Sequence, residues 1–370
     1  MNSISINRIL NSDKHFNKNV SISGWVRTFR ANRFIALNDG SCFNNIQCVV
    51  DFEKTEQEIL KKITTGAALN IKGKVVKSQG SQQSIEIMVD ECKILGESNP
   101  EVYPIQPKKH SFEFLRENAH LRIRTNTFSA VMRIRSNLSF AIHEFFKKNG
   151  FYYVHTPIIT ASDAEGAGEQ FRVSTLDMKN PPLNNYGQID FNKDFFGKET
   201  NLTVSGQLEA EAYAMSMGKV YTFGPTFRAE NSNTSRHLSE FWMIEPEVAF
   251  MDIEGNMKLA EDFLKYILSY LIDHNADDLK FLENRLTAEE KQKPQNERSV
   301  MTLIEKLHFV TQNDFKIITY SEAYQILKNC KPNKKKKFNY VIDEWGSDLQ
   351  SEHERFLVEK EFNCPVIIYD

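Results

Sequence analysis

Residues 20–95 alternate between apolar and polar positions in short runs, and turn residues such as Asn38-Asp39-Gly40 separate the runs. Such alternation is typical of strands with one buried face. A helical pattern at residues 52–65 interrupts the series before the fourth run. The predicted strands are residues 20–26, 34–37, 46–50, 69–75 and 85–89.

Five strands with a helix before the fourth predict a small Greek-key barrel of the OB type, whose outer face commonly binds oligonucleotides. Prolines at positions 100, 104 and 107 follow the barrel. Because clustered prolines stiffen the chain and stop regular structure, they predict a linker.

Beyond the linker, apolar residues recur every three or four positions from Phe128 to Phe145. This spacing predicts a long helix that opens at Thr125 and ends near Gly150, followed by a strand at residues 151–156. A length of 370 residues suits two domains. The predicted division is a barrel at residues 1–103, a linker at 104–125 and an α+β domain at 126–370.

Residues 223–247 contain the largest group of candidate ligand-binding side chains in the chain. The pattern predicts strands at 220–223 and 241–244, with a bend at Gly224-Pro225. Arg228 carries a planar fork that can hold a phosphate through two parallel hydrogen bonds, which makes it the candidate catalytic residue and α-phosphate clamp.

Three more residues of this run complete a candidate nucleotide site. Glu230 can accept a hydrogen bond from an exocyclic amine, His237 can donate to an outer phosphate, and Phe241 can stack on a base. Taken in isolation, Arg228 and Glu230 would more commonly form an ordinary cross-strand ion pair, and Phe241 would be a core residue.

The order Phe-Arg-x-Glu, a polar loop and then Arg236-His237-Leu238-Ser239-Glu240-Phe241 resembles motif 2 of the class II aminoacyl-tRNA synthetases. The full run from Phe227 to Glu247 is similar to that of asparaginyl-tRNA synthetases. The resemblance implies an antiparallel sheet flanked by helices, with ATP and Mg²⁺ used to convert asparagine to its adenylate before transfer to tRNA(Asn). Catalysis would rest on positioning and charge stabilisation, without a protein nucleophile.

The barrel segment at residues 24–50 resembles the anticodon-binding barrel of the asparaginyl, aspartyl and lysyl synthetases. The resemblance implies that Phe34 stacks on an anticodon base, Gln47 reads a base edge and Arg27 holds backbone or base. In an isolated barrel, Phe34 would equally suit the core and Gln47 would be a solvated strand residue.

Residues 203–211 resemble the amino-acid pocket of the same family, in which aspartyl enzymes carry a lysine where this chain has Ala210. Glu211 can accept from a carboxamide and repel a carboxylate, which favours asparagine over aspartate. By resemblance, Glu165, Ser205 and Gln207 would contact the α-amino group. The alternative is an amphipathic helix in which Glu209 and Glu211 are solvated, and for Glu209 we expect it.

The long helix and following strand resemble motif 1, which implies a homodimer through residues 126–157. The formal net charge is −3, so contacts with nucleic acid must be local. The five cysteines lack C-x-x-C spacing, so we expect no metal ligands. No apolar run reaches the roughly 18 residues of a membrane helix and no leader pattern opens the chain, so we expect a cytoplasmic protein without membrane contact.

The family places Gly-Gly-Ser-Gln-Arg-Glu and the Gly-x-Gly-x-x-Arg of motif 3 beyond the last matching segment, and neither occurs in these 370 residues. We therefore expect a C-terminally truncated chain with few Mg²⁺ ligands and little activity alone. Three alternatives stay open: an aspartyl-tRNA synthetase of relaxed specificity, a relative of asparagine synthetase, and a catalytically dead tRNA-binding fragment.

Overall fold

The computed structural model describes residues 3–80, 83–164, 166, 168–231, 237–295 and 298–369. The chain forms two compact units: Met1–Asn137 with Leu271–His308, and Leu138–Tyr270 with Phe309–Asp370. The boundary falls within α4 (Asn126–Lys148) and α6 (Ile253–His274), so it differs from the division expected from the linker prolines.

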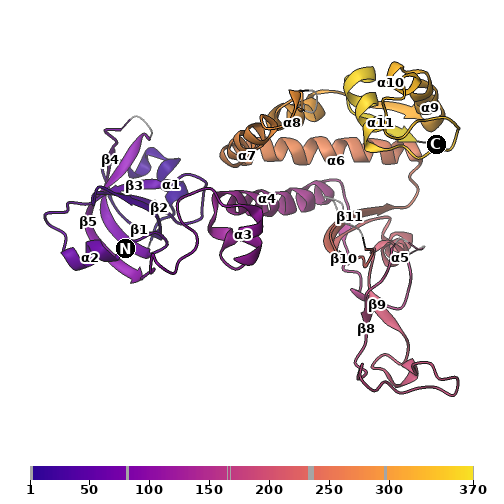
Figure 1. Ribbon diagram of the computed structural model, residues 1–370, viewed down its shortest axis with the longest axis horizontal. Helices are drawn as coiled ribbons and strands as arrows, with labels where there is room; N and C mark the ends of the chain where they lie inside the picture. Colours follow the sequence, from indigo (N-terminus) through magenta and orange to yellow (C-terminus); the bar gives the residue numbers. More distant parts are fainter. Residues whose placement is uncertain are drawn as a thin grey trace. The chain divides into compact units, whose positions relative to one another are not determined.

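A closed five-stranded barrel dominates the first unit, with the strand order β1-β2-β3-β5-β4 (Figure 1). This confirms the predicted OB-type barrel, although the interrupting helix α2 (Gln57–Lys62) is shorter than its pattern at residues 52–65 suggested. The strands are β1 (Asn19–Arg30), β2 (Phe34–Asn38), β3 (Ile46–Val49), β4 (Ala68–Lys77) and β5 (Ile85–Gly96).

The barrel interior is filled by the inward-facing members of the alternating runs, together with Ile6 and Ile9 from α1 (Ile6–Leu10). Each fully buried aliphatic side chain stabilises the fold by about 1.5–3 kcal/mol. Gly73 allows the closest strand approach, because a Cβ there would lie 2.1 Å from the Met88 carbonyl oxygen. The fully buried members include Ile22, Ile35, Leu37, Ile46, Leu69, Ile71 and Ile87.

Helices of the first unit lie beside the barrel. Arg133 on α4 holds Asp278 on α7 (Ala276–Glu290) through its Nε and one terminal nitrogen, at 2.7–3.1 Å. Such a paired fork fixes two helices relative to each other. The remaining elements of this unit are η1 (Asp13–His15), α3 (Phe112–Glu117), η2 (Arg122–Arg124) and the start of α8 (Leu303–Gln312).

The second unit is built on a sheet of order β11-β10-β6, comprising β11 (Glu240–Val248), β10 (Lys219–Phe227) and β6 (Tyr152–Tyr153). The bend expected at Gly224-Pro225 is wrong, because β10 continues through both residues in register with β11. Proline is tolerated there because β6 pairs only with Val220 and Tyr221, so no described neighbour needs a hydrogen bond from position 225. The strand expected at residues 151–156 covers only Tyr152 and Tyr153, the two residues that pair with β10.

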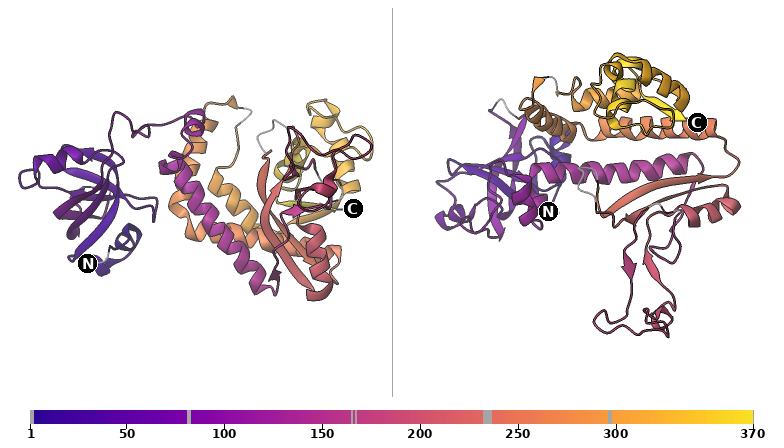
Figure 2. Two further views of the ribbon diagram at one scale, coloured as in Figure 1. Left: turned by 90° about the horizontal axis from the view of Figure 1, so that it is seen from below. Right: turned by 45° about the vertical axis from the view of Figure 1, so that its right-hand side comes forward.

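The two faces of this sheet are covered differently (Figure 2). Phe146 of α4, Tyr221 of β10 and Phe263 of α6 belong to one apolar cluster on the first face. On the opposite face, Ala210 and Ala214 of α5 (Gln207–Met217) pack against Val220.

The rest of the second unit completes the α+β fold. Thr319 and Glu322 form a reciprocal capping box at the start of α9 (Tyr320–Asn329). No described helix is long and apolar enough to cross a membrane. The other elements are β7 (Ile159–Thr160), β8 (Arg172–Val173), η3 (Phe191–Lys193), β9 (Thr200–Leu202), β12 (Lys316–Thr319), α10 (Lys331–Lys334), α11 (Ser351–Phe356), the π-helix η5 (Leu357–Phe362) and β13 (Val366–Tyr369).

Candidate functional site

The carboxylate of Glu245, in the middle of β11, ties α5 to the sheet. Its Oε1 accepts a short hydrogen bond from the Ser205 hydroxyl. Its Oε2 accepts from the Gly206 N–H at 3.1 Å and from the Thr222 hydroxyl at 2.8 Å. Both oxygens are therefore engaged, and the loop that starts α5 is held in one position on the sheet.

Glu211, Glu245 and Glu247 form an acidic group at this end of the sheet face. Burial, with the charges of Glu211 and Glu245, raises the pKa of Glu247 above its ordinary value. Because residues two apart on a strand point the same way, Glu245 and Glu247 lie on one face of β11. The group is thus a concentration of negative potential, suited to cationic or hydrogen-bond-donating ligands.

Arg228 lies beyond the other end of that face, just after β10. Its guanidinium carbon is 5.5 Å from the centroid of the Phe241 ring. Its Nε is buried and has no hydrogen-bond partner among the described residues. Phe241 is half-buried, so it is not the core residue of the alternative interpretation.

Gly168 packs tightly against the side chains of Arg228 and Glu230. A Cβ at this position would lie 2.6 Å from Glu230 Oε1 and 3.1 Å from Arg228 Cδ. The neighbouring Glu169 carbonyl accepts from the Ala229 N–H at 2.7 Å. Gly168 therefore lies directly beside the side chains of Arg228 and Glu230.

A shared strand face connects the two halves of the site. Phe241, Glu245 and Glu247 all point to one side of β11, with Arg228 near the first and Glu211 near the last. Six strand steps separate Phe241 from Glu247, which corresponds to roughly 20 Å. Arg228 and Glu211 therefore face the same side of the sheet from opposite ends.

The other residues predicted to form the pocket differ in how far they are exposed. Gln207 and Glu211 are exposed on the first turns of α5, and His237 is exposed after β10. Glu165 lies outside the described residues. Glu209, expected to be solvated, is half-buried, and Thr160 donates a hydrogen bond to its Oε1 at 3.5 Å.

The sequence analysis assigned no role to Glu245 or Glu247. Glu245 binds groups about 20 and 40 positions earlier in the chain, and such long-range contacts leave no local pattern. One available signal was the alternation of glutamates with apolar residues near the end of the β11 segment, which places both on one strand face.

On the barrel, Phe34 and Gln47 share the outer face. Phe34 pairs with Val49 across the ladder and Gln47 pairs with Ala36, so the two side chains are diagonal neighbours. Gln47 Nε2 donates to Glu86 Oε2 at 2.9 Å, which fixes the orientation of the amide. Glu86 is only 6% exposed and was not foreseen in the sequence.

Arg27 is placed differently from Phe34 and Gln47. It lies at the register shift between Val26 and Thr28 and donates to the Arg124 carbonyl through a short hydrogen bond. Burial lowers the pKa of its guanidinium, and its Nε has no partner in the described part of the chain. Phe34 and Gln47 are thus neighbours on the barrel surface, whereas Arg27 contacts η2.

Two family models match this chain. Residues 111–370 match the class II tRNA synthetases of the D, K and N group, and residues 20–95 match the OB-fold nucleic acid binding domain. The synthetase model covers well over half of the chain. The chain therefore has the fold of a class II tRNA synthetase and belongs to that class.

Individual relatives narrow the assignment further. The chain is 56% identical over 372 residues to the asparagine–tRNA ligase of Cytophaga hutchinsonii, with 100% of this chain and 76% of that protein covered. It is 54% identical over 360 residues to the asparagine–tRNA ligase of Azobacteroides pseudotrichonymphae, covering 96% of this chain and 74% of the relative. This chain belongs to the asparagine–tRNA ligase family and spans about three-quarters of the length of these relatives.

A solved structure agrees with this assignment. The asparaginyl-tRNA synthetase of Pyrococcus horikoshii, crystallised with asparaginyl-adenylate, superposes with a TM-score of 0.75 at 26% identity. The match covers 100% of this chain and 74% of that chain.

Proposed function

We propose that this chain activates asparagine with ATP and transfers it to tRNA(Asn). The asparagine carboxylate would attack the α-phosphorus of ATP, which forms asparaginyl-adenylate and releases pyrophosphate. A hydroxyl at the tRNA 3′ end would then attack the activated carbonyl and release AMP. The observation that carries the proposal is the single sheet face with Arg228 and Phe241 at one end and Glu211 at the other.

The nucleotide would bind at the Arg228 end. The adenine would stack on Phe241, with the exocyclic amine donating to Glu230 and the α-phosphate held by the Arg228 guanidinium. The unpartnered, buried Nε of Arg228 supports this role, since a phosphate oxygen would satisfy it. His237 would contact an outer phosphate.

Mg²⁺ would enter with the ATP phosphates and neutralise the leaving pyrophosphate. In the described residues, no group of three His, Cys, Asp or Glu side chains is placed to hold a metal ion. The guanidinium of Arg228 would add to this charge stabilisation.

The amino acid would bind at the acidic end. Glu211 would accept from the carboxamide NH₂ of asparagine, and the like charges of Glu245 and Glu247 nearby would repel an aspartate. Ala210 is fully buried against Val220, so the helix presents no cation at that position. Glu165 and Gln207 would contact the α-amino group, and Ser205 would contribute through the loop that Glu245 fixes.

The barrel would recognise the anticodon through Phe34 and Gln47, with Arg27 contributing from its side of β1. We also propose a homodimer formed through residues 126–157, where Phe140 and Tyr152 are 69% and 57% exposed. The five cysteines are free, which fits a cytoplasmic location where thiols stay reduced.

A binding experiment tests the proposal on the chain as it stands. Asparaginyl sulfamoyl-adenosine, a non-hydrolysable mimic of the adenylate, should bind at least about 100-fold more tightly than the aspartyl analogue, because the latter buries a repelled carboxylate. Equal affinity for both analogues would favour an aspartyl enzyme of relaxed specificity. Binding of tRNA(Asn) without binding of either analogue would select the tRNA-binding fragment.

A further inference from the structure

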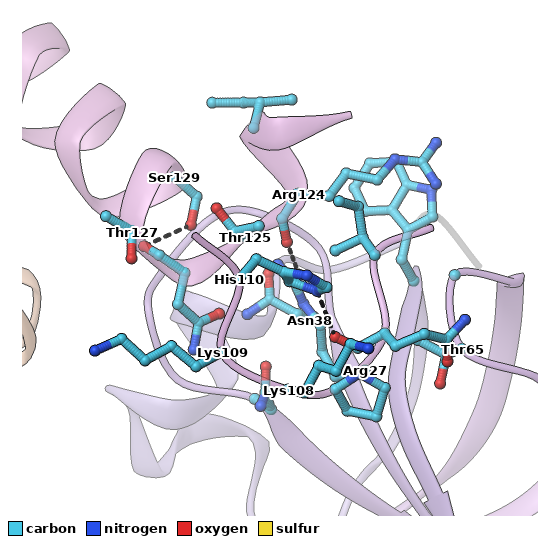
Figure 3. A pocket seen from close by; sticks show the side chains of 18 of the residues that line it. Arg27, Asn38, Thr65, Lys108, Lys109, His110, Arg124, Thr125, Thr127 and Ser129 are labelled. Atoms are coloured by element: carbon cyan, nitrogen blue, oxygen red, sulfur yellow. Dashed lines mark hydrogen bonds between the residues drawn. The ribbon is translucent and has the colours of Figure 1, made fainter. Parts of the chain in front are cut away.

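A large cavity lies within the first unit (Figure 3). Its volume is about 1150 Å³, and its walls come from β1, the linker, η2, α4 and α7. The barrel reaches α7 through a Phe43–Phe281 ring contact at 4.9 Å and an Asn44–Asp277 hydrogen bond at 2.7 Å. Of these four residues, Phe281 also lines the cavity.

The charges on the cavity wall are of one sign. Six lysine and arginine side chains line it, and no aspartate or glutamate does. Two of the six are already neutralised, since Arg133 pairs with Asp278 at 2.7 Å and Arg285 pairs with Glu289 at 3.2 Å. The four cations left without a carboxylate partner in the described chain are Arg27, Lys108, Lys109 and Arg124.

Arg27 and Arg124 are half-buried, whereas Lys108 and Lys109 are exposed. The Arg27 guanidinium donates to the Arg124 carbonyl, while its buried Nε has no described partner. Burial and the neighbouring charges of Arg133 and Arg124 lower the pKa of Arg27. A buried cation among like charges is costly unless an anion accompanies it, so the geometry calls for an acceptor inside the cavity.

The remaining wall is suited to an organic molecule. Trp25 and Tyr103 present rings, and Ile105 and Leu115 are buried apolar residues beside them. Arg124 lies 5.6 Å from the centroid of Tyr103, which sets its guanidinium next to a ring surface. Cavities of this kind, with apolar walls and a few convergent polar groups, bind small ligands or single groups of larger ones.

We propose that this cavity binds a phosphate group, held by Arg27 and Arg124 with Lys108 and Lys109 at the rim. Arginine forks match phosphate oxygens through paired hydrogen bonds, and such an oxygen would satisfy the orphan Nε of Arg27. The phosphate belongs either to a free nucleotide or pyrophosphate, or to the backbone of a bound RNA. The site shares no residue with the proposed adenylate site, and it includes Arg27, which was proposed above to contribute to anticodon recognition.

Tryptophan fluorescence of the full 370-residue chain tests this proposal, because Trp25 lines the cavity. The probes are sodium pyrophosphate, ATP and a short RNA duplex without an anticodon loop. A Trp25→Phe variant identifies the part of the signal that arises in the cavity. For ATP, the titration is repeated in an Arg228→Ala background, which separates this cavity from the adenylate site.

The test variant is Arg124→Ala, and the matched control is Arg122→Ala. Both arginines belong to η2, but Arg122 stacks over Phe128 at 4.8 Å and does not line the cavity. We expect about tenfold weaker binding in Arg124→Ala, the loss typical of one charge-assisted hydrogen bond, and unchanged binding in Arg122→Ala. If Arg124→Ala does not fold, a Lys108→Ala/Lys109→Ala double variant at two exposed positions replaces it.

A saturable response to pyrophosphate or ATP that depends on Arg124 identifies a free phosphate ligand. A response to the RNA duplex alone, again dependent on Arg124, identifies a backbone phosphate. No saturable response to any probe, or equal loss in Arg122→Ala and Arg124→Ala, overturns the proposal.

Discussion

The guanidinium carbon of Arg228 lies 5.5 Å from the centroid of the Phe241 ring, across the end of the β10–β11 hairpin. This contact sets a permanent cation beside an aromatic face. A nucleotide needs both surfaces at once, one for its base and one for its phosphate. The pairing therefore gives one end of the sheet face its proposed role.

Replacing Arg228 by lysine should weaken binding of the adenylate mimic about 10- to 100-fold, because an ammonium cannot make two parallel hydrogen bonds to a phosphate. Isothermal titration measures the change. Arg172→Lys is the control, since Arg172 pairs with Glu199 at an exposed position of the same unit. Unaltered affinity in Arg228→Lys would show that the α-phosphate is held elsewhere.

Glu245→Ala should destabilise the second unit by about 2–4 kcal/mol. The substitution leaves the Ser205 and Thr222 hydroxyls and the Gly206 N–H without their shared acceptor, and each unsatisfied buried donor costs about 1–3 kcal/mol without full additivity. Urea denaturation followed by circular dichroism measures the loss. The control is Glu240→Ala, an exposed residue at the start of β11, which should change stability little. A loss no larger than in the control would refute the tying role of Glu245.

The raised pKa of Glu247 makes a pH-dependent prediction. A carboxyl whose pKa is higher in the folded state contributes stability that is fully present below its unfolded value of 4.5 and is lost as pH rises through the folded value. Glu247→Gln removes the charge, so it should raise the melting temperature relative to the unsubstituted chain at neutral pH. The gain should disappear below pH 4.5. A gain of equal size at both pH values would mean that Glu247 is not the titrating group.

Phe34→Leu should weaken binding of tRNA(Asn) by about 5- to 150-fold, the range given by roughly 1–3 kcal/mol for loss of one base–ring stacking contact. Filter binding measures the affinity. Phe52→Leu is the matched control, because Phe52 is 45% exposed and lies outside the barrel strands. Similar affinities for all three proteins would remove Phe34 from the RNA surface.

Elements with strong local patterns were predictable. The five barrel strands and the helix at Asn126–Lys148 follow from apolar spacing, which reports the buried face directly. The continuation of β10 through Gly224-Pro225 could not be predicted in this way. Whether a strand tolerates proline depends on how far the neighbouring strand, here β6, extends.

The site residues divide along the same line. Arg228, Phe241 and Glu211 were predicted from their motifs, and all three lie beside one face of the sheet. The roles of Glu245 and Glu86 depend on hydrogen bonds to residues about 40 positions away in the chain, Ser205 for Glu245 and Gln47 for Glu86. The orientation of Arg27 depends on the register shift in β1 between Val26 and Thr28, which no sequence pattern predicted.

The most direct measurement is the affinity of asparaginyl sulfamoyl-adenosine for four forms of the chain: unsubstituted, Arg228→Ala, Glu211→Gln and the double variant. If one ligand spans the sheet face, it binds with one-to-one stoichiometry and each single substitution weakens binding by at least about tenfold, equivalent to 1.4 kcal/mol. Full affinity retained in either single variant would place that side chain outside the adenylate site and contradict the account.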